Sequence, residues 1–195
     1  VIDALQTTVK EGYRFEDEEF NKVFASGHHL ILMTTHRREN LGEPMRHVYR
    51  ALKSVLEAHP DVEAIFPVHK NPKVREIVRE ELGHLDRVHL IEPMEYEPFA
   101  NLMAKVDIVL TDSGGIQEEA PSLGKPVLVM RDTTERPEGI AAGTLKLVGT
   151  EEETIYKEFS RLLSDKDEYE AMSKASNPYG DGHACERIAD VLCKM

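Results

Sequence analysis

The chain has 195 residues, of which 41% are hydrophobic and 31% are charged, and its formal net charge is −12. This length favours one domain with a core of its own, and this composition excludes most disordered proteins. The acidic balance argues against a nucleic-acid-binding protein, because such proteins usually present a basic face. No apolar run approaches the length of a membrane-spanning helix, no signal peptide opens the chain, and only two cysteines occur, so we expect a reduced, cytoplasmic protein.

Six short apolar runs alternate along the chain with longer segments of helical period. The runs show little polar alternation, which is typical of strands that helices cover on both faces. Strands are predicted at His29–Thr34, Val62–Val68, Arg87–Ile91, Asp107–Leu110, Pro126–Met130 and Thr144–Val148. Helices are predicted between and after them, at residues 45–59, 74–82, 98–105, 115–123, 151–163 and 165–174. The alternation predicts an α/β fold with a doubly wound, mostly parallel sheet of the Rossmann-like type.

Both ends of the chain have an amphipathic pattern, with no strand between them and the sheet. Residues 1–13 and 184–195 are each predicted to be helical. We expect one domain whose Rossmann-like core spans residues 14–176, with residues 1–13 as a hinge segment and residues 177–195 as a turn followed by a helix. Because no methionine opens the chain, we expect it to be a fragment whose ends pack on another domain.

Ligands of doubly wound sheets bind beyond the carboxyl ends of the strands, so the turns that follow the strands are the candidate sites. The most informative turn is Ser113-Gly114-Gly115, which lies between a buried strand and a helix. Two glycines let backbone N–H groups approach a ligand, and the helix start adds partial positive charge, which together suit a phosphate. The alternative is that Asp112 or Ser113 only caps the helix.

Two carboxylates, Glu118 and Glu119, follow one turn into the same helix and could simply complement the helix dipole. Glu119 also lies more than one helical turn beyond Ser113, a suitable distance for a nucleoside whose phosphate binds at the helix start. A carboxylate at that place can accept hydrogen bonds from both hydroxyls of a ribose.

Charged side chains follow other strands too. His36, Arg37 and Arg38 follow the first strand, where arginines can bind phosphate and a histidine can move a proton, unless the segment is only a solvated loop. His69 follows the second strand, and Arg136 lies beyond the fifth. No Cys/His spacing or carboxylate cluster indicates a metal site, and the sequence lacks the motif around a hydrolase serine.

Five segments taken together carry a specific resemblance, at residues 35–40, 67–72, 112–121, 131–138 and 177–182. They resemble motifs of the non-hydrolysing UDP-N-acetylglucosamine 2-epimerases, in the same order and along essentially the whole chain. Members of that family have two Rossmann-like domains in the glycosyltransferase-B arrangement, with the substrate in the cleft between them. The chain is similar to the second, C-terminal, UDP-binding domain alone, so the resemblance implies that the first domain is missing.

The resemblance implies an isomerase that interconverts UDP-N-acetylglucosamine (UDP-GlcNAc) and UDP-N-acetylmannosamine (UDP-ManNAc) in polysaccharide biosynthesis. The implied route eliminates UDP across C1–C2 to give a 2-acetamidoglucal, and UDP adds back after C2 is reprotonated from the other face. No cofactor is implied. The implied partners are UDP, the two UDP-sugars, the chain's own N-terminal domain and, in the full-length enzyme, a second copy in a homodimer. The family's proton-transferring carboxylates lie in the first domain, so the chain alone is expected to be inactive.

The resemblance also implies roles for individual residues. Ser113, Gly114 and Gly115 would bind the diphosphate, and Glu119 would bind the ribose hydroxyls. His36 matches the family's functional histidine, and we expect it to act on the leaving group rather than as the base at C2.

Four further residues receive roles from the resemblance. Phe99 would contact the uracil, and Arg136 matches an arginine that contacts the substrate. Arg37 and His69 are candidates for a second, regulatory nucleotide-sugar site. Three alternatives stay open: a UDP-sugar glycosyltransferase of the same architecture, a hydrolysing 2-epimerase and a non-catalytic nucleotide-sugar sensor.

Overall fold

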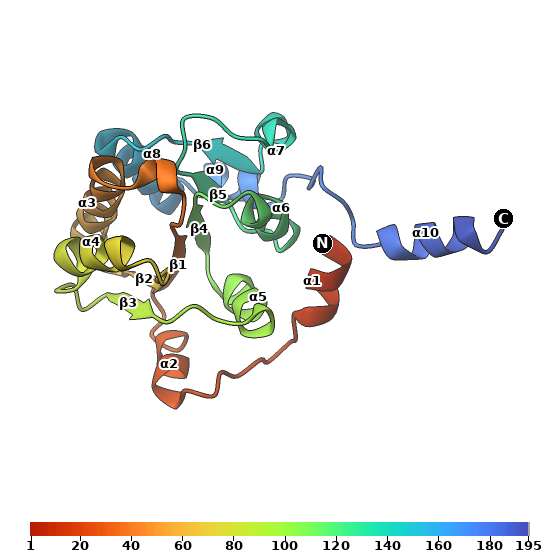
Figure 1. The fold of residues 1–195 in the computed structure, drawn as a ribbon, viewed down its shortest axis with the longest axis horizontal. Coiled ribbons are helices and arrows are strands. Elements are labelled where there is room, and N and C mark those ends of the chain that lie inside the picture. The colour runs from red at the N-terminus through yellow and green to blue at the C-terminus, as the bar shows by residue number, and fades with distance from the viewer. Residues whose placement is uncertain (195) are drawn as a thin grey trace.

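The computed structural model describes residues 1–194 and has a six-stranded sheet at its centre (Figure 1). The sheet order is β3-β2-β1-β4-β5-β6, and every neighbouring pair of strands is parallel. The chain builds outward from β1 to β3, returns to place β4 beside β1, and then builds outward to β6. The strands are β1 (His29–Thr34), β2 (Val62–Pro67), β3 (Val88–Ile91), β4 (Ile108–Thr111), β5 (Val127–Val129) and β6 (Leu145–Leu147). The predicted Rossmann-like sheet is confirmed. The order in which strands are added reverses between β1 and β4, and this place is the topological switch point of the sheet.

Helices cover both faces of this sheet. One face carries α3 (Glu43–Ala58), α4 (Pro72–Leu82), α8 (Glu152–Ser164) and α9 (Lys166–Ser173). The other face carries α1 (Ile2–Thr8), α2 (Glu18–Val23), α5 (Tyr96–Lys105) and α6 (Gly114–Ser122). The remaining elements are the short 3-10 turn η1 (Arg38–Asn40), α7 (Pro137–Ala142) and α10 (Ala184–Leu192).

Each face of the sheet has its own hydrophobic core, which explains why the strands read as continuous apolar runs. Along β1, Ile31 and Met33 point into the core under α3, α4 and α8, whereas Leu30 and Leu32 point into the core under α1, α5 and α6. All four side chains are buried. A strand that is covered on both faces has no position left for a polar side chain to reach water.

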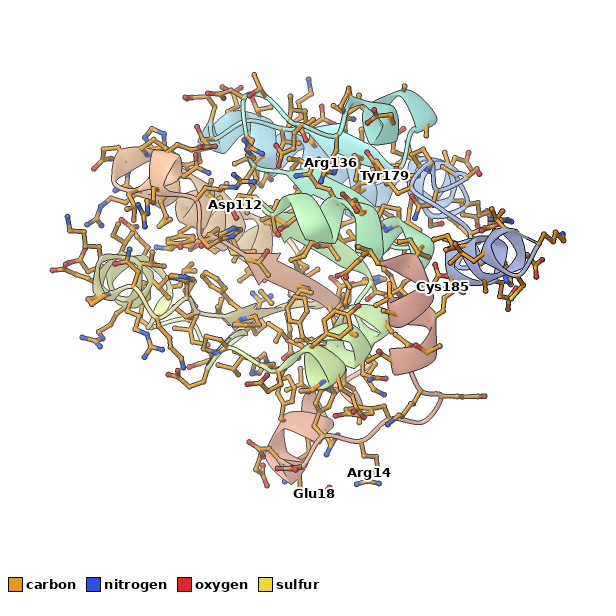
Figure 2. All side chains as sticks on the ribbon, turned by 45° about the vertical axis from the view of Figure 1, so that its right-hand side comes forward. Arg14, Glu18, Asp112, Arg136, Tyr179 and Cys185 are labelled. Atoms are coloured by element: carbon orange, nitrogen blue, oxygen red, sulfur yellow. The ribbon has the colours of Figure 1, made fainter. Side chains whose placement is uncertain are left out.

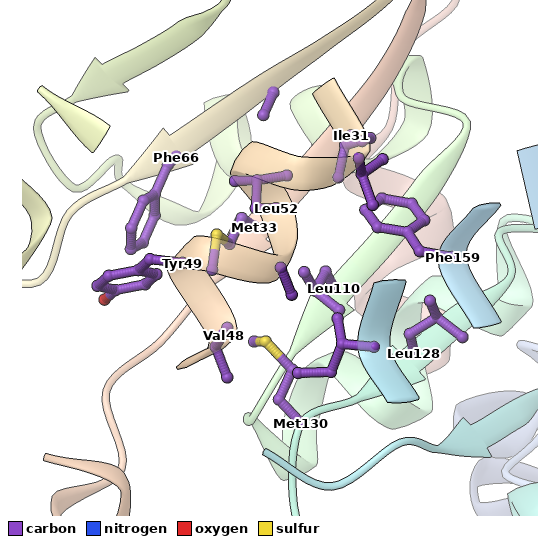
Figure 3. Close-up of a cluster of buried hydrophobic side chains, with 14 of the residues drawn as sticks. Ile31, Met33, Val48, Tyr49, Leu52, Phe66, Leu110, Leu128, Met130 and Phe159 are labelled. Carbon is purple, nitrogen blue, oxygen red and sulfur yellow. The ribbon is translucent and has the colours of Figure 1, made fainter. Parts of the chain in front are cut away.

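The core under α3 extends to the carboxyl end of β1 (Figure 3). Tyr49 of α3 lies against Phe66 of β2, with 5.7 Å between ring centroids, and both rings are buried. The buried Tyr49 hydroxyl is 2.7 Å from the Thr35 hydroxyl, directly after β1. Burial raises the pKa of Tyr49 well above its ordinary value, so this hydroxyl stays neutral. The hydrogen bond fixes the start of the loop that carries His36.

Two short helices were not predicted. In α2, Asp17 caps the first turn by accepting hydrogen bonds from the N–H groups of Glu19 (2.9 Å) and Phe20 (3.2 Å). Helix α7 starts at Pro137 and ends before Gly143, which has a φ of +79°. Both helices have only six residues, which are too few to give a helical period. In α7, the proline at the start and the glycine after the end are the usual boundary signals.

The N-terminal helix is shorter than predicted and packs on the domain itself. Helix α1 ends at Thr8, because the side chain of Asn101 accepts a hydrogen bond from Lys10 N (2.8 Å) and donates one to Thr8 O (3.2 Å). These bonds hold Val9 in an extended conformation next to α5, before the chain turns at residues 11–12. Leu5 of α1 is fully buried in the core under α5 and α6.

The C-terminal helix, in contrast, extends away from the body of the domain (Figure 1). The α10 side chains Ile188, Val191 and Leu192 are 59%, 62% and 64% exposed. The last residue of this predicted helix, Met195, lies outside the described residues. Across residues 1–194, no helix combines the length and the apolar character needed to cross a membrane.

One buried strand position of the described chain carries a carboxylate. Glu63 of β2 lies between two histidines, with His28 Nδ1 2.7 Å from Oε1 and His89 Nε2 2.5 Å from Oε2. Burial alone would raise the pKa of Glu63, but the hydrogen bonds with His89 and His28 outweigh it and lower the pKa below the ordinary 4.5. The two histidines thereby allow a charged side chain inside the sheet.

We expect the Glu63→Gln variant to lose stability at neutral pH. A lowered folded-state pKa means that ionised Glu63 stabilises the fold above pH 4.5, and this contribution disappears as pH falls through the folded-state pKa. The difference in free energy of unfolding between wild type and Glu63→Gln should therefore shrink with acid, as measured by urea denaturation. Exposed Glu153 on α8 gives the control, Glu153→Gln. A difference that stays constant or grows with acid would contradict the assignment.

Phe159 of α8 provides a test of the packing between α8 and the sheet. Its side chain is fully buried beside α3, so Phe159→Ala should lower the free energy of unfolding by about 3–5 kcal/mol. The matched variant Leu192→Ala, on exposed α10, should change it by less than about 0.5 kcal/mol. Equal losses in both variants would show that α10 contributes as much to folding as the core does.

Candidate functional site

The loops after β1 and β4 lie next to each other at the topological switch point of the sheet. One buried carboxylate connects the two loops. Asp112 follows β4 and is completely buried (Figure 2). Its Oδ2 atom accepts hydrogen bonds from the backbone N–H groups of His36 and Arg37, each at 2.9 Å. Its Oδ1 atom lies 2.8 Å from His36 Nδ1. Two backbone donors and the adjacent His36 ring thus compensate a buried carboxylate that would otherwise be very costly.

The Asp112 contact also orients the His36 ring. Because Nδ1 faces a carboxylate oxygen, which can only accept, this contact favours the form of the ring that carries a proton on Nδ1. The other ring nitrogen, Nε2, is left for a ligand, and the His36 side chain is 41% exposed. A histidine held in one orientation by a buried carboxylate can donate to or accept from a group that binds above the sheet.

Side chains at the ends of β1 and β4 also connect the two strands beneath these loops. The hydroxyls of Thr34 and Thr111, the last residues of β1 and β4, are 2.6 Å apart. Thr111 Oγ1 also accepts a hydrogen bond from Ser113 N at 3.0 Å. Among the described residues, the Ser113 side chain makes no capping bond to α6, and the Asp112 carboxylate is committed to the His36 loop. Helix capping therefore does not explain either residue.

The two glycines at the start of α6 serve different purposes. A β-carbon on Gly114 would lie only 2.6 Å from Glu135 Oε1, so a glycine is needed for this carboxylate to approach. Apart from its chain neighbours and the adjacent helix backbone, a β-carbon on Gly115 would meet no described atom within 4 Å, so open space lies above the first turn of α6. The N–H groups of a first helical turn lack partners within the helix, which makes that space suitable for an anion.

A network of arginines and glutamates surrounds the start of α6. Arg37 Nη2 is 2.9 Å from Glu135 Oε1, and Glu135 also pairs with Arg131. Arg131 Nε in turn lies 3.2 Å from Glu39 Oε1. The Glu135 backbone N–H, Arg131 and Arg37 together hold the pKa of the Glu135 carboxyl below its ordinary value. Arginines from the loops after β1 and β5 therefore lie at this edge of the sheet, paired with Glu135 and Glu39, although the whole chain is acidic.

Arg136 is positioned by the turn that precedes α10. Its Nε lies 2.5 Å from Glu118 Oε1 on α6. The Tyr179 hydroxyl donates to Arg136 O (3.1 Å) and accepts from Gly139 N (2.8 Å), which holds Tyr179 next to Arg136 (Figure 2). Asn177 Nδ2 donates to Glu118 O at 3.1 Å. The segment at residues 177–182 thus braces the Arg136 loop against α6.

Glu119 lies farther along α6 and faces α5. The Tyr96 hydroxyl donates a hydrogen bond to Glu119 Oε1 at 3.0 Å. Burial raises the pKa of Glu119 above its ordinary value, and burial together with this carboxylate raises the pKa of Tyr96 to about 12. Phe99, one turn after Tyr96, is half-buried and packs against the core under α5 and α6.

The two residues expected at a regulatory site have different surroundings. The exposed His69 ring lies beside His36, with 6.5 Å between ring centroids, and its Nδ1 accepts a hydrogen bond from Asn71 N at 3.1 Å. Arg37 instead turns toward Glu135 and the start of α6, with Nη2 3.8 Å from where a Gly114 β-carbon would be. Arg37 thus lies at the expected diphosphate site, and its regulatory role stays a prediction.

Three residues of this arrangement were not predicted as functional: Asp112 as the partner of His36, Glu135 beside Gly114, and Tyr96 beside Glu119. The information that would have linked them is the pairing of β1 with β4. Pairing of Thr34 with Thr111 places the residues after these two strands next to each other. The sequence does not show which strands are neighbours, so this pairing could not be used.

Comparison with known proteins agrees with the sequence resemblance. A family model described as UDP-N-acetylglucosamine 2-epimerase matches residues 1–193. The UDP-N-acetylglucosamine 2-epimerase of Bacillus subtilis (strain 168) is 56% identical over 191 residues, which are 98% of this chain and 49% of that protein.

Solved structures of relatives have the same fold. A structure of S. aureus MnaA with UDP matches 98% of this chain and 51% of its own, at 47% identity and a TM-score of 0.92. The UDP-GlcNAc 2-epimerase of Neisseria meningitidis, bound to UDP-GlcNAc, matches 100% of this chain and 53% of its own, at 44% identity and a TM-score of 0.87. A glycosyltransferase C-terminal domain from Francisella tularensis, only 16% identical with a TM-score of 0.64, shares the fold alone.

This chain spans about half the length of the relatives that it matches. The family model nevertheless covers almost every residue, and the five segments that suggested the resemblance lie within the match. The predicted family is therefore confirmed: the chain belongs to the UDP-N-acetylglucosamine 2-epimerase family.

Proposed function

We propose that this chain is the UDP-binding half of an enzyme that interconverts UDP-GlcNAc and UDP-ManNAc. The observation that carries the proposal is the buried Asp112, which holds His36 beside the open first turn of α6. Departure and return of UDP require a site that binds the diphosphate and a side chain beside it that stabilises the leaving group. The start of α6 and His36 have these two roles in the proposal. The relatives named for this activity support the substrate class.

The diphosphate binds at the start of α6 in this proposal. Within residues 1–194 the Ser113 hydroxyl makes no capping bond, and the space above Gly115 is open. Backbone N–H groups and the helix dipole favour an anion at that point, and Arg37 adds a positive charge. The nucleoside then lies along α6, with the ribose hydroxyls on Glu119 and the uracil near Phe99. Arg136 contacts the substrate from the loop before α7.

His36 stabilises the leaving group. The C2 proton of the sugar is not acidic, so its removal depends on cationic character that develops at C1 as the UDP departs. With protons on both ring nitrogens, His36 donates a hydrogen bond from Nε2 to the departing diphosphate and stabilises the transition state of that step. Asp112 holds the His36 ring in place for this role. UDP stays bound while C2 of the 2-acetamidoglucal is reprotonated, and then adds back.

The rest of the active site lies in the half that the longer relatives have in addition. The carboxylates that move the C2 proton belong there, so this chain alone is inactive in the proposal. The exposed apolar side chains of α10 would pack on that half. The complete enzyme is proposed to be a homodimer, and Arg37 and His69 to contribute to a regulatory nucleotide-sugar site.

The direct test joins this chain to the missing half of the Bacillus subtilis relative and measures conversion of UDP-GlcNAc. We expect UDP-ManNAc as product, with traces of UDP and the glycal. His36→Asn should reduce turnover by about 100-fold or more and leave UDP affinity nearly unchanged. The control is His84→Asn, an exposed histidine after α4. Sugar transfer to an acceptor, or release of free N-acetylmannosamine, would instead indicate a glycosyltransferase or a hydrolysing epimerase.

Gly115→Val tests the diphosphate site without disturbing the fold. The new side chain enters open space, so the free energy of unfolding should change little, but it occupies the place proposed for the diphosphate. We expect UDP binding, followed by NMR titration of the 195-residue chain, to weaken by at least about 10-fold. The control Ala141→Val places the same side chain at an exposed position on α7. Unchanged affinity in Gly115→Val would place the diphosphate elsewhere.

A further inference from the structure

The hydrogen bond between Tyr96 and Glu119 connects α5 and α6 at the place proposed for the nucleoside. Tyr96 is the first residue of α5, and its hydroxyl donates to Glu119 Oε1 at 3.0 Å. Tyr96 is 43% exposed, and the Glu119 carboxylate that its hydroxyl contacts is half-buried. The contact joins two helices that flank the same face of the sheet.

We propose that Tyr96 is a positioning residue for ribose recognition, which fixes the Glu119 carboxylate through Oε1 and leaves Oε2 for a hydroxyl of the ligand. This role rests on the function proposed above, in which Glu119 accepts from the ribose. Two hydrogen bonds to one carboxylate, one from the protein and one from the ligand, use both of its oxygens.

The charges around Glu119 explain why such a partner is needed. Burial favours the neutral acid, and Glu118 lies next to Glu119 on α6, so the pKa of Glu119 is raised. The hydrogen bond from the Tyr96 hydroxyl on α5 acts in the opposite direction. A neutral carboxyl group would carry a proton where the ribose hydroxyl has to donate one. Tyr96 therefore favours the ionised form that can accept two hydrogen bonds.

Tyr96 also restricts where the carboxylate can point. A glutamate side chain has several rotatable bonds, and ordering it at the moment of binding would cost affinity. Because Oε1 is already held by a rigid phenol, the direction of Oε2 is set before the ligand arrives. This arrangement predicts that the contribution of Tyr96 is seen only with ligands that have ribose hydroxyls.

The test compares wild type with Tyr96→Phe, which removes only the hydroxyl, using two probes. UDP has both ribose hydroxyls, and 2′,3′-dideoxyuridine diphosphate has neither but carries the same base and diphosphate. We expect Tyr96→Phe to weaken UDP binding by about 10-fold and to leave binding of the dideoxy compound unchanged. The acid-side loss of UDP affinity should also move to higher pH in the variant, because Glu119 loses a donor that stabilises its ionised form. The dideoxy probe corrects for titration of the diphosphate itself.

Two further variants separate the possible outcomes. Tyr156→Phe removes a hydroxyl from α8, on the opposite face of the sheet, and should bind both probes like wild type. Glu119→Gln should bind UDP only about as well as wild type binds the dideoxy compound.

If wild type binds both probes equally, Glu119 does not recognise ribose, and the nucleoside placement in the proposed function fails. If wild type prefers UDP but Tyr96→Phe keeps the same preference and the same pH profile, the role of Tyr96 is wrong and the proposed function stands. Equal weakening of both probes in Tyr96→Phe would reveal a merely structural role and would also overturn the inference.

Discussion

The contact of Asp112 with the His36 loop is the interaction on which the candidate site depends. A completely buried carboxylate is tolerated here because two backbone N–H groups donate to it and the His36 ring nitrogen Nδ1 lies 2.8 Å from its other oxygen. These contacts place His36 beside the start of α6, although 76 positions separate His36 from Asp112 in the sequence. Without this carboxylate, the His36 ring and the backbone N–H groups of His36 and Arg37 would lose the contacts that hold them beside the proposed diphosphate site.

The distribution of charge matters more for this site than the total charge. The chain carries −12, yet Arg37 and Arg131 converge on Glu135 next to Gly114. Each arginine comes from a different strand end, and the fold brings them together because parallel strands end at the same edge of the sheet. Part of the acidic excess lies on α2, which precedes β1 and therefore belongs to the opposite edge. Net charge describes the surface of the protein as a whole and does not describe the site.

Much of the fold could be predicted because buried parallel strands have a distinctive composition. All six strands and the Rossmann-like class follow from apolar runs alternating with helical segments. The short helices α2 and α7 could not be predicted from periodicity, because each has fewer than two turns. The site was predicted only in part, since Ser113, Gly114 and Gly115 follow from the strand–glycine–helix pattern. The contacts of Asp112 and Tyr96 depend on which strands and helices are neighbours, which the sequence alone does not reveal.

If Asp112 holds His36 in one orientation, the Nε2 atom of the ring is directed at the diphosphate of bound UDP. The most direct measurement is the ¹⁵N NMR spectrum of the His36 ring at mildly alkaline pH, recorded with and without UDP. We expect the free ring to carry a proton on Nδ1, facing Asp112, and we expect Nε2 to carry a proton that it donates to the diphosphate when UDP binds. A ring with its proton on Nε2 in the free protein, or no change in either nitrogen at saturating UDP, would contradict this role of Asp112.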